Sequence, residues 1–253
     1  GSLFERAEVK DLLALLSVLV DRRAMGLVRV ACWPDFTASF ADVATIFEHL
    51  RAGEHTPGSW LQQVDTIPGV SDAGRQALAR LAVALNGFHQ TTSPWTVLAS
   101  LLLDRTRISA RLGTSADLAD RTRGIAIWQF LNFVRVQPAG RGLPITRLLD
   151  RVRRLVRLGD DRDLRQLPAA GQHLDAVRLM TIHGAKGLEF GGVHIPGLNS
   201  DTIPRTPPAP PCPAPDGMIA GAEGSALEAF RAGQAEEQEC LFYVAQSRAR
   251  DRL

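Results

Sequence analysis

The sequence predicts an α/β fold that also contains a long, purely helical stretch. Two apolar runs, residues 176–182 and 193–198, have the composition of buried parallel strands, and a polar turn with glycines separates them. Between about residues 37 and 171, in contrast, apolar residues recur at helical spacing between turns that contain glycine or proline. Because the two patterns occupy separate stretches, we expect a sheet-containing domain and a mainly helical one.

The composition is that of a soluble globular protein. Its 253 residues suffice for one large or two modest domains, and 45% of them are hydrophobic. A net charge of +2 is too small to indicate a nucleic-acid partner by itself. The three cysteines show no Cys-x-x-Cys spacing, which indicates neither a disulfide framework nor a zinc site, and we expect no metal ligands. With neither a signal peptide nor an apolar run of about 18 residues, we expect a cytoplasmic protein without a membrane partner.

The helical part of the chain is predicted element by element. At the start, Val9, Leu12, Leu16 and Val20 recur at helical spacing and predict a helix that opens near Leu3. Further helices are predicted over residues 40–50, 74–88, 95–103, 124–136 and 143–158.

Two features of this helical part have two interpretations each. The turn at residues 67–71 is either a plain turn or a helix-hairpin-helix turn, whose backbone N–H groups would bind DNA phosphate. Arg147, Arg151 and Arg154 lie at i, i+4 and i+7 and share one helix face. That face is either a solvated surface or a DNA-binding surface that follows the phosphates.

Polar side chains gather at the end of the first predicted strand. Thr181, His183, Lys186 and Glu189 follow it within a few positions, and Gly184 and Gly187 frame the lysine. Ligands of α/β folds bind in the crevice beyond the carboxyl ends of the strands. We therefore expect these residues to form a binding site.

Three stretches resemble known motifs. Residues 181–190 (Thr-Ile-His-Gly-Ala-Lys-Gly-Leu-Glu-Phe) resemble motif V of the UvrD/Rep/RecB-type superfamily 1 DNA helicases, and residues 241–250 resemble motif VI of the same family. Residues 3–11 resemble its motif IVa. The resemblance implies part of a RecA-like (P-loop NTPase-type) second motor domain that is interrupted by a mainly helical inserted domain. Residues 1–36 and 173–253 would be the two segments of that motor domain, called 2A, and 37–172 the inserted domain, called 2B.

The resemblance also implies roles for single residues. Arg248 matches the motif VI arginine that reaches the γ-phosphate of ATP, where it would act catalytically on developing charge. Glu189 matches the glutamate that contacts the nucleotide sugar, and Thr181 and His183 match positions that face single-stranded DNA. On the nucleotide side we also expect Gln246, Lys186 and Gly187, whereas Tyr243 is predicted to lie in the core. Whether Lys186 serves phosphate or packing stays open.

The implied function is that of a helicase that works with ATP and Mg²⁺. The sequence contains no Gly-x-x-x-x-Gly-Lys-[Ser/Thr] phosphate loop, so most phosphate and Mg²⁺ ligands would lie outside this chain, in the N-terminal motor domain of the same polypeptide. We expect an inactive C-terminal fragment of an enzyme that translocates 3′ to 5′ on single-stranded DNA and unwinds duplexes at junctions, in repair or recombination. The alternatives are the helicase part of a RecB/AddA-type helicase-nuclease and a non-catalytic DNA- or protein-binding module with the same fold.

Overall fold

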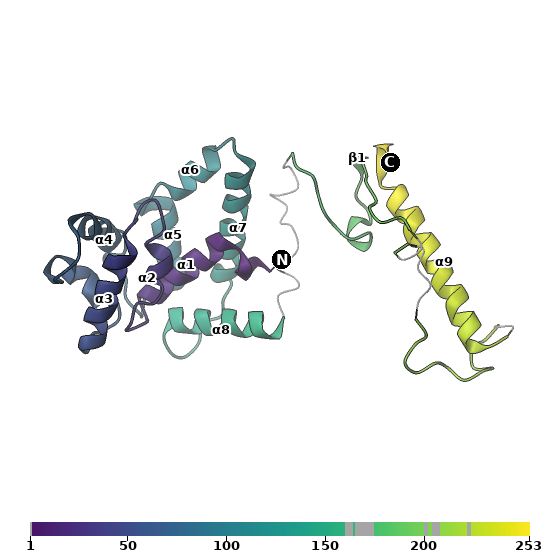
Figure 1. The fold of residues 1–253 in the computed structure, drawn as a ribbon, viewed down its shortest axis with the longest axis horizontal. Coiled ribbons are helices and arrows are strands. Elements are labelled where there is room, and N and C mark those ends of the chain that lie inside the picture. The colour runs from purple at the N-terminus through teal and green to yellow at the C-terminus, as the bar shows by residue number, and fades with distance from the viewer. Residues whose placement is uncertain (1, 160–163, 165–174, 200–201, 204–207, 222–223) are drawn as a thin grey trace. The chain divides into compact units, whose positions relative to one another are not determined.

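The chain divides into two compact units. The computed structural model describes residues 2–159, 164, 175–199, 202–203, 208–221 and 224–253. Unit 1 comprises residues 1–176 and unit 2 residues 177–253. Figure 1 draws unit 1 in purple to teal and unit 2 in green to yellow.

Unit 1 is helical throughout its described part. Its α-helices are α1 (Ala7–Val18), α2 (Leu27–Val30), α3 (Phe40–Ala52), α4 (Asp72–Ala84), α5 (Pro94–Ser100), α6 (Ile108–Thr114), α7 (Leu118–Arg135) and α8 (Pro144–Leu158). Shorter helical turns are the 3-10 turns η1 (Leu3–Glu5) and η2 (Ser59–Thr66) and the π-helical turn η3 (Leu101–Arg105). The helices predicted from apolar spacing are confirmed with shifted ends, whereas η2 and α6 were not predicted.

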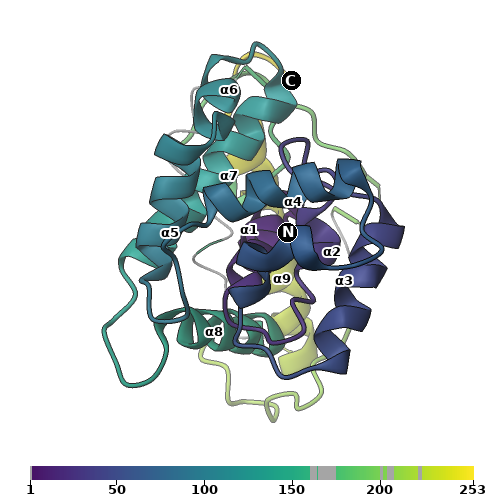
Figure 2. The same cartoon turned by 90° about the vertical axis from the view of Figure 1, so that its left-hand side faces the viewer.

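The core of unit 1 is organised around α1. This helix contacts α2, α5, α7 and α8, and its Val9, Leu12, Leu15 and Leu16 are at most 1% exposed. Figure 2 shows α1 in the middle of these helices. Residues 1–36 thus pack into the same unit as the helices that follow. Their predicted place in the motor domain therefore has no support in these contacts and stays a prediction, and the predicted boundary at residues 172–173 lies outside the described residues.

The corner between α1 and α2 requires a glycine. A Cβ on Gly26 would lie 2.0 Å from the carbonyl oxygen of Ala14 and 2.3 Å from Oγ of Ser17. The two backbones therefore approach each other closely. Ala24, which is fully buried in the same corner, has a φ of 49°, a strained value for a residue with a Cβ.

A buried carboxylate joins the starts of α3 and α4. Asp42 is 3% exposed and accepts hydrogen bonds from Oγ of Ser39 (2.6 Å) and from N and Oγ of Ser71 (2.7 and 2.9 Å). Burial raises the pKa of Asp42, but the hydrogen bonds from Ser39 and Ser71 outweigh it and hold this pKa below its ordinary value. Ser71 also caps α4 through the N–H of Gly74. Because a protein carboxylate occupies this N–H of the 67–71 turn, the structure supports the plain-turn interpretation.

Unit 2 is built from a small sheet and a long helix. Strands β1 (Phe190–Gly192) and β2 (Ala249–Arg252) pair in parallel, and α9 (Ala226–Gln246) precedes β2; the 3-10 turn η6 spans His183–Ala185. Together with unit 1 this gives a general α/β class. The predicted strands at 176–182 and 193–198 are both wrong: no described strand pairs with residues 177–181, and the strand that forms begins three residues before Val193.

Exposure distinguishes unit 2 from unit 1. Val177 and Leu179, which the sequence predicts in a buried strand, are 101% and 97% exposed. The buried hydrophobic residues among the described part of unit 2 are alanines: Ala185, Ala226 and Ala245. None of the helices in the described ranges is long and apolar enough to cross a membrane.

Candidate functional site

Arg248 lies in the turn that joins α9 to β2. The N–H of Ser247 and the N–H of Arg248 donate to Tyr243 O (2.9 Å) and Ala245 O (3.3 Å), which ends the helix. The guanidinium of Arg248 donates to Val244 O (3.2 Å), Leu188 O (3.3 Å) and Oγ of Ser247 (3.0 Å). The side chain is therefore half-buried and held against backbone carbonyls, where sequence alone predicted only its position at the end of a helix.

The same arginine holds the segment that carries Glu189. Its guanidinium binds Leu188 on one side of the glutamate, and its carbonyl oxygen accepts the N–H of Phe190 on the other side (2.9 Å). The structure thus brings together Glu189 and Arg248, which are far apart in the sequence. A third group, the exposed Arg250, was not predicted: its pKa is raised by the hydrogen bond and charge of Asp251 and, to a smaller extent, by the charge of Glu189.

The predicted DNA-facing residues form a tight turn before β1. Oγ1 of Thr181 accepts the N–H of Gly184 (3.1 Å), and the carbonyl oxygen of Thr181 accepts the N–H of Ala185 (3.1 Å). Gly187, with a φ of 82°, then reverses the chain in a conformation that favours glycine. His183 and Lys186 are exposed on this turn. The hydroxyl of Thr181 therefore closes the turn, and His183 and Lys186 are open to a ligand.

The end of α9 corrects one prediction. Tyr243, predicted as a core residue, is 71% exposed, whereas Gln246, one turn further along α9, is half-buried beside the turn of Arg248. The helix packs on a sheet that, in the described residues, comprises β1 and β2, and this leaves one of its faces uncovered. The helix begins with a capping box, in which Ser225 and Glu228 bond each other's backbone N–H, and these bonds lower the pKa of Glu228.

The three arginines predicted on α8 lie in unit 1 and do different things. Arg147 is half-buried and donates to the carbonyl oxygens of residues 140–142 in the loop before α8. Arg151 and Arg154 are exposed, and no described residue forms a hydrogen bond or ion pair with them. Arg147 thus fastens a loop, which its spacing alone did not indicate.

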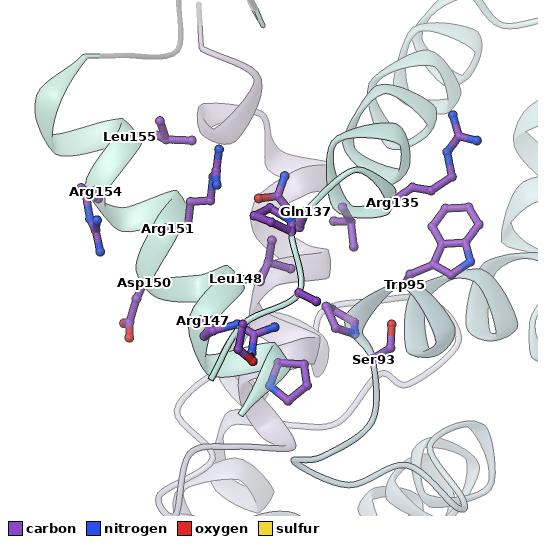
Figure 3. A pocket seen from close by; sticks show the side chains of 16 residues that line it. Ser93, Trp95, Arg135, Gln137, Arg147, Leu148, Asp150, Arg151, Arg154 and Leu155 are labelled. Atoms are coloured by element: carbon purple, nitrogen blue, oxygen red, sulfur yellow. The ribbon is translucent and has the colours of Figure 1, made fainter. Parts of the chain in front are cut away.

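A cleft opens between the start of α5, the end of α7 and α8. It has a volume of about 770 Å³, and its wall includes all three predicted arginines. Figure 3 shows Arg147, Arg151 and Arg154 on α8 and, across the cleft, Gln137 on the loop that joins α7 to α8. Sequence analysis missed the residues contributed by other elements: Trp95, Arg135 and Gln137. The described residues contain no cluster of three or more His, Cys, Asp or Glu that would hold a metal, so Mg²⁺ ligands are not found among them.

Comparison with known proteins identifies the C-terminal part of the chain. Residues 147–253 match the model of the UvrD-like helicase C-terminal domain, and the match covers the turn at 181–187, Glu189 and Arg248. The chain carries the C-terminal part of a UvrD-like helicase. This UvrD-like part includes β1, α9 and β2 and begins within α8.

Two curated relatives agree with the UvrD-like assignment. The ATP-dependent DNA helicase PcrA of Bacillus subtilis is 26% identical over 215 residues, which take in 80% of this chain and 28% of PcrA. An ATP-dependent helicase/nuclease protein of Desulforudis audaxviator is 28% identical over 286 residues, or 99% of this chain and 21% of that protein. The UvrD-like chain therefore spans about a quarter of the length of these relatives.

Proposed function

We propose that the protein to which this chain belongs is an ATP-dependent DNA helicase, which couples ATP hydrolysis to 3′–5′ translocation on single-stranded DNA and to duplex unwinding in repair or recombination. Both relatives are named as ATP-dependent helicases, one of them a DNA helicase. Since the chain covers 28% and 21% of them, the activity belongs to a larger protein. In this proposal unit 2 is part of a RecA-like motor domain, and residues 37–172 are the inserted helical domain.

The placement of Arg248 supports this function most strongly. Two carbonyls, Leu188 O and Val244 O, and the hydroxyl of Ser247 hold its guanidinium in one orientation, beside the segment of Glu189. An arginine presents a rigid, permanently charged fork, which suits it to stabilise charge that develops on a transferring phosphoryl group. In the proposal Arg248 plays this role for ATP bound with Mg²⁺, and Glu189 accepts hydrogen bonds from the sugar hydroxyls. Gln246, Lys186 and Gly187 complete the nucleotide side.

The turn before β1 is proposed to face single-stranded DNA. His183 is exposed there and can donate a hydrogen bond to a phosphate oxygen. Thr181 supports the turn from within, because its hydroxyl accepts the N–H of Gly184. A Thr181→Val variant should therefore weaken DNA binding by loosening the turn rather than by removing a phosphate contact.

The test is the ATPase activity of the full-length protein with and without single-stranded DNA. The Arg248→Ala variant should lose about a thousandfold or more of the DNA-stimulated rate while nucleotide binding is retained. Arg248→Lys should stay impaired because lysine lacks the planar fork. Arg231→Ala, an exposed arginine on the same helix α9, serves as the matched control and should keep the wild-type rate.

An unchanged rate in Arg248→Ala would contradict the proposal and would favour a non-catalytic binding module. A lowered rate that comes with an equally lowered melting temperature would mean that Arg248 only fastens the turn. The chain of residues 1–253 alone should show no ATP turnover, because it lacks a phosphate loop. The helicase-nuclease alternative is not separated by the comparisons, since the two relatives are almost equally similar.

A further inference from the structure

The cleft in unit 1 concentrates positive charge that the fold itself does not neutralise. Arg135 at the end of α7 and Arg151 and Arg154 on α8 line it, and none of the three forms an ion pair with a described residue. The acidic residue of the wall, Asp150, already accepts a hydrogen bond from Arg153 at 2.9 Å. The cleft therefore presents three guanidinium groups without a described acidic partner, and guanidinium suits phosphate better than any other side chain does.

The rest of the wall offers a flat aromatic surface and a hydrogen-bond acceptor. Trp95, half-buried at the start of α5, lines the same cleft together with Pro94 and Leu148. Gln137 donates its amide group to Phe133 O at 2.6 Å, but its Oε1 is buried and accepts no hydrogen bond from the described residues. Such an orphaned acceptor in a wall suits a ligand that carries an N–H donor.

The shape of the cleft depends on Arg147. Its guanidinium binds the carbonyl oxygens of residues 140–142 and so ties the loop between α7 and α8 back onto α8. This contact separates Arg147 from its neighbours on the helix face: it shapes the wall, while Arg151 and Arg154 remain available. Arg153 and Arg157, which complete the arginine run of α8, do not line the cleft.

We propose that this cleft binds one nucleotide of a single-stranded DNA segment, with the base against Trp95 and the flanking phosphates on Arg151, Arg154 and Arg135. Phosphate-binding arginines beside a half-buried tryptophan match how proteins hold unpaired strands, by charge along the backbone and stacking on the base. A volume of about 770 Å³ is in the range of small-molecule sites and admits a single base with its sugar and phosphate. A duplex keeps its base faces covered, so only an unpaired base reaches Trp95.

The choice of DNA as the ligand rests on the proposed helicase function; the charge and the aromatic wall are independent of it. The amide oxygen of Gln137 would accept an N–H of the bound base. This is a nucleic-acid contact on the helical unit, separate from the turn at Thr181 and His183 in unit 2.

The proposal is tested by fluorescence anisotropy of a labelled oligothymidine of about 15 nucleotides with the chain of residues 1–253, over a range of salt concentrations. The double variant Arg151→Ala/Arg154→Ala should weaken binding about tenfold or more at low salt. It should also reduce the slope of log K against log salt by about 1.4, or about 0.7 for each lost phosphate contact. Arg153→Ala/Arg157→Ala removes the same charge from the same helix outside the cleft, and should leave the slope close to that of the wild type. Equal losses in the two double variants would overturn the cleft as the site.

The base contact is tested separately with an oligonucleotide whose central positions are abasic. It should bind the wild type about fivefold less tightly than the intact strand does, since stacking on an aromatic side chain is lost. In Trp95→Leu, which keeps an apolar side chain at this half-buried position, intact and abasic strands should bind equally. Equal binding of both strands to the wild type would overturn the stacked base.

The two proposals fail in different ways. If the full-length protein shows DNA-stimulated ATPase activity but the cleft variants bind DNA like the wild type, the cleft proposal is wrong and the helicase remains. If no DNA-stimulated ATPase activity is found while the cleft variants lose DNA binding, the helicase proposal is wrong and a nucleic-acid-binding module remains.

Discussion

Unit 1 and unit 2 bury their apolar residues to very different extents. Unit 1 has a continuous core in which large side chains such as Trp60 and Phe130 are at most 1% exposed. The buried hydrophobic residues described in unit 2 are three alanines, while Val177 and Leu179 stand fully exposed. Helices can cover one another within a continuous stretch of chain, but a parallel strand needs neighbours that are distant in sequence. Unit 1 is thus complete as a packed body, and unit 2 has apolar surface suited to a partner.

Truncation of an aromatic side chain in each unit gives the largest expected contrast. Phe130→Ala should destabilise unit 1 by about 3–5 kcal/mol, because a fully buried ring leaves a cavity. Tyr243→Ala on α9, where the ring is 71% exposed, should change stability by less than about 0.5 kcal/mol.

Urea unfolding followed by tryptophan fluorescence measures the first variant selectively, since all four tryptophans lie in unit 1: Trp33, Trp60, Trp95 and Trp128. Hydrogen exchange of α9 follows the second. A large effect of Tyr243→Ala would show that α9 is covered in solution and would weaken the contrast between the units.

A glycine-to-alanine pair tests the same contrast in the backbone. Gly26→Ala should cost unit 1 about 1–3 kcal/mol or more, because the new methyl group meets Ala14 O, a backbone atom that cannot move aside. Gly192→Ala at the end of β1 meets nothing within 4 Å and should be neutral or slightly stabilising. Melting temperatures of the two variants check this, and a stable Gly26→Ala protein would mean that the α1–α2 corner is looser than the structure has it.

Acidification should affect unit 1 through Asp42. The folded state holds the pKa of Asp42 below its ordinary value of 3.8, so the folded protein binds fewer protons there than the unfolded chain. The stabilisation is therefore fully present above the ordinary pKa and is lost as the pH falls through the lowered one. The stability difference between wild type and Asp42→Asn should be constant above about pH 5 and shrink below about pH 4. Urea unfolding at each pH measures it, and a difference that grows on acidification would contradict the sign.

The smallest expected effect is at the start of α9. Ser225→Ala removes the capping box with Glu228 and should cost about 1 kcal/mol of helix stability. The loss should appear as faster hydrogen exchange in the first turn of α9 with no change in the tryptophan signal from unit 1. A loss spread over the whole chain would indicate that the two units unfold together.

The helices of unit 1 could be predicted because apolar residues at a spacing of three and four identify a helix face locally. The strands could not. Apolar runs predicted strands at 176–182 and 193–198, but a strand forms only where a ladder partner is available, and the partner of β1 is β2, 57 residues or more along the chain. Alternation of side chains carries no information about which neighbour is present.

Parts of the candidate site could be predicted from motif resemblance. The pairing of Arg248 with the segment of Glu189 follows from two motifs in one chain, and the structure adds the hydrogen bonds that hold it. The cleft of Trp95, Arg135 and Gln137 could not be predicted, because these residues come from three separate positions that only helix packing brings together. Tyr243 was misplaced because an aromatic residue near a motif reads as core, whereas the face of α9 that carries it has no described cover.

Leu188 has a mechanical consequence for the two ends of the site. Its N–H donates to Ala185 O in the turn that carries His183, and its carbonyl oxygen accepts the guanidinium of Arg248. A single peptide segment therefore links the turn to the arginine, with no side chain between them. Any displacement of the turn is passed to Arg248 over one residue, like the short arm of a rocker. The length of that arm is fixed by the backbone, so side-chain substitutions at position 188 leave it unchanged.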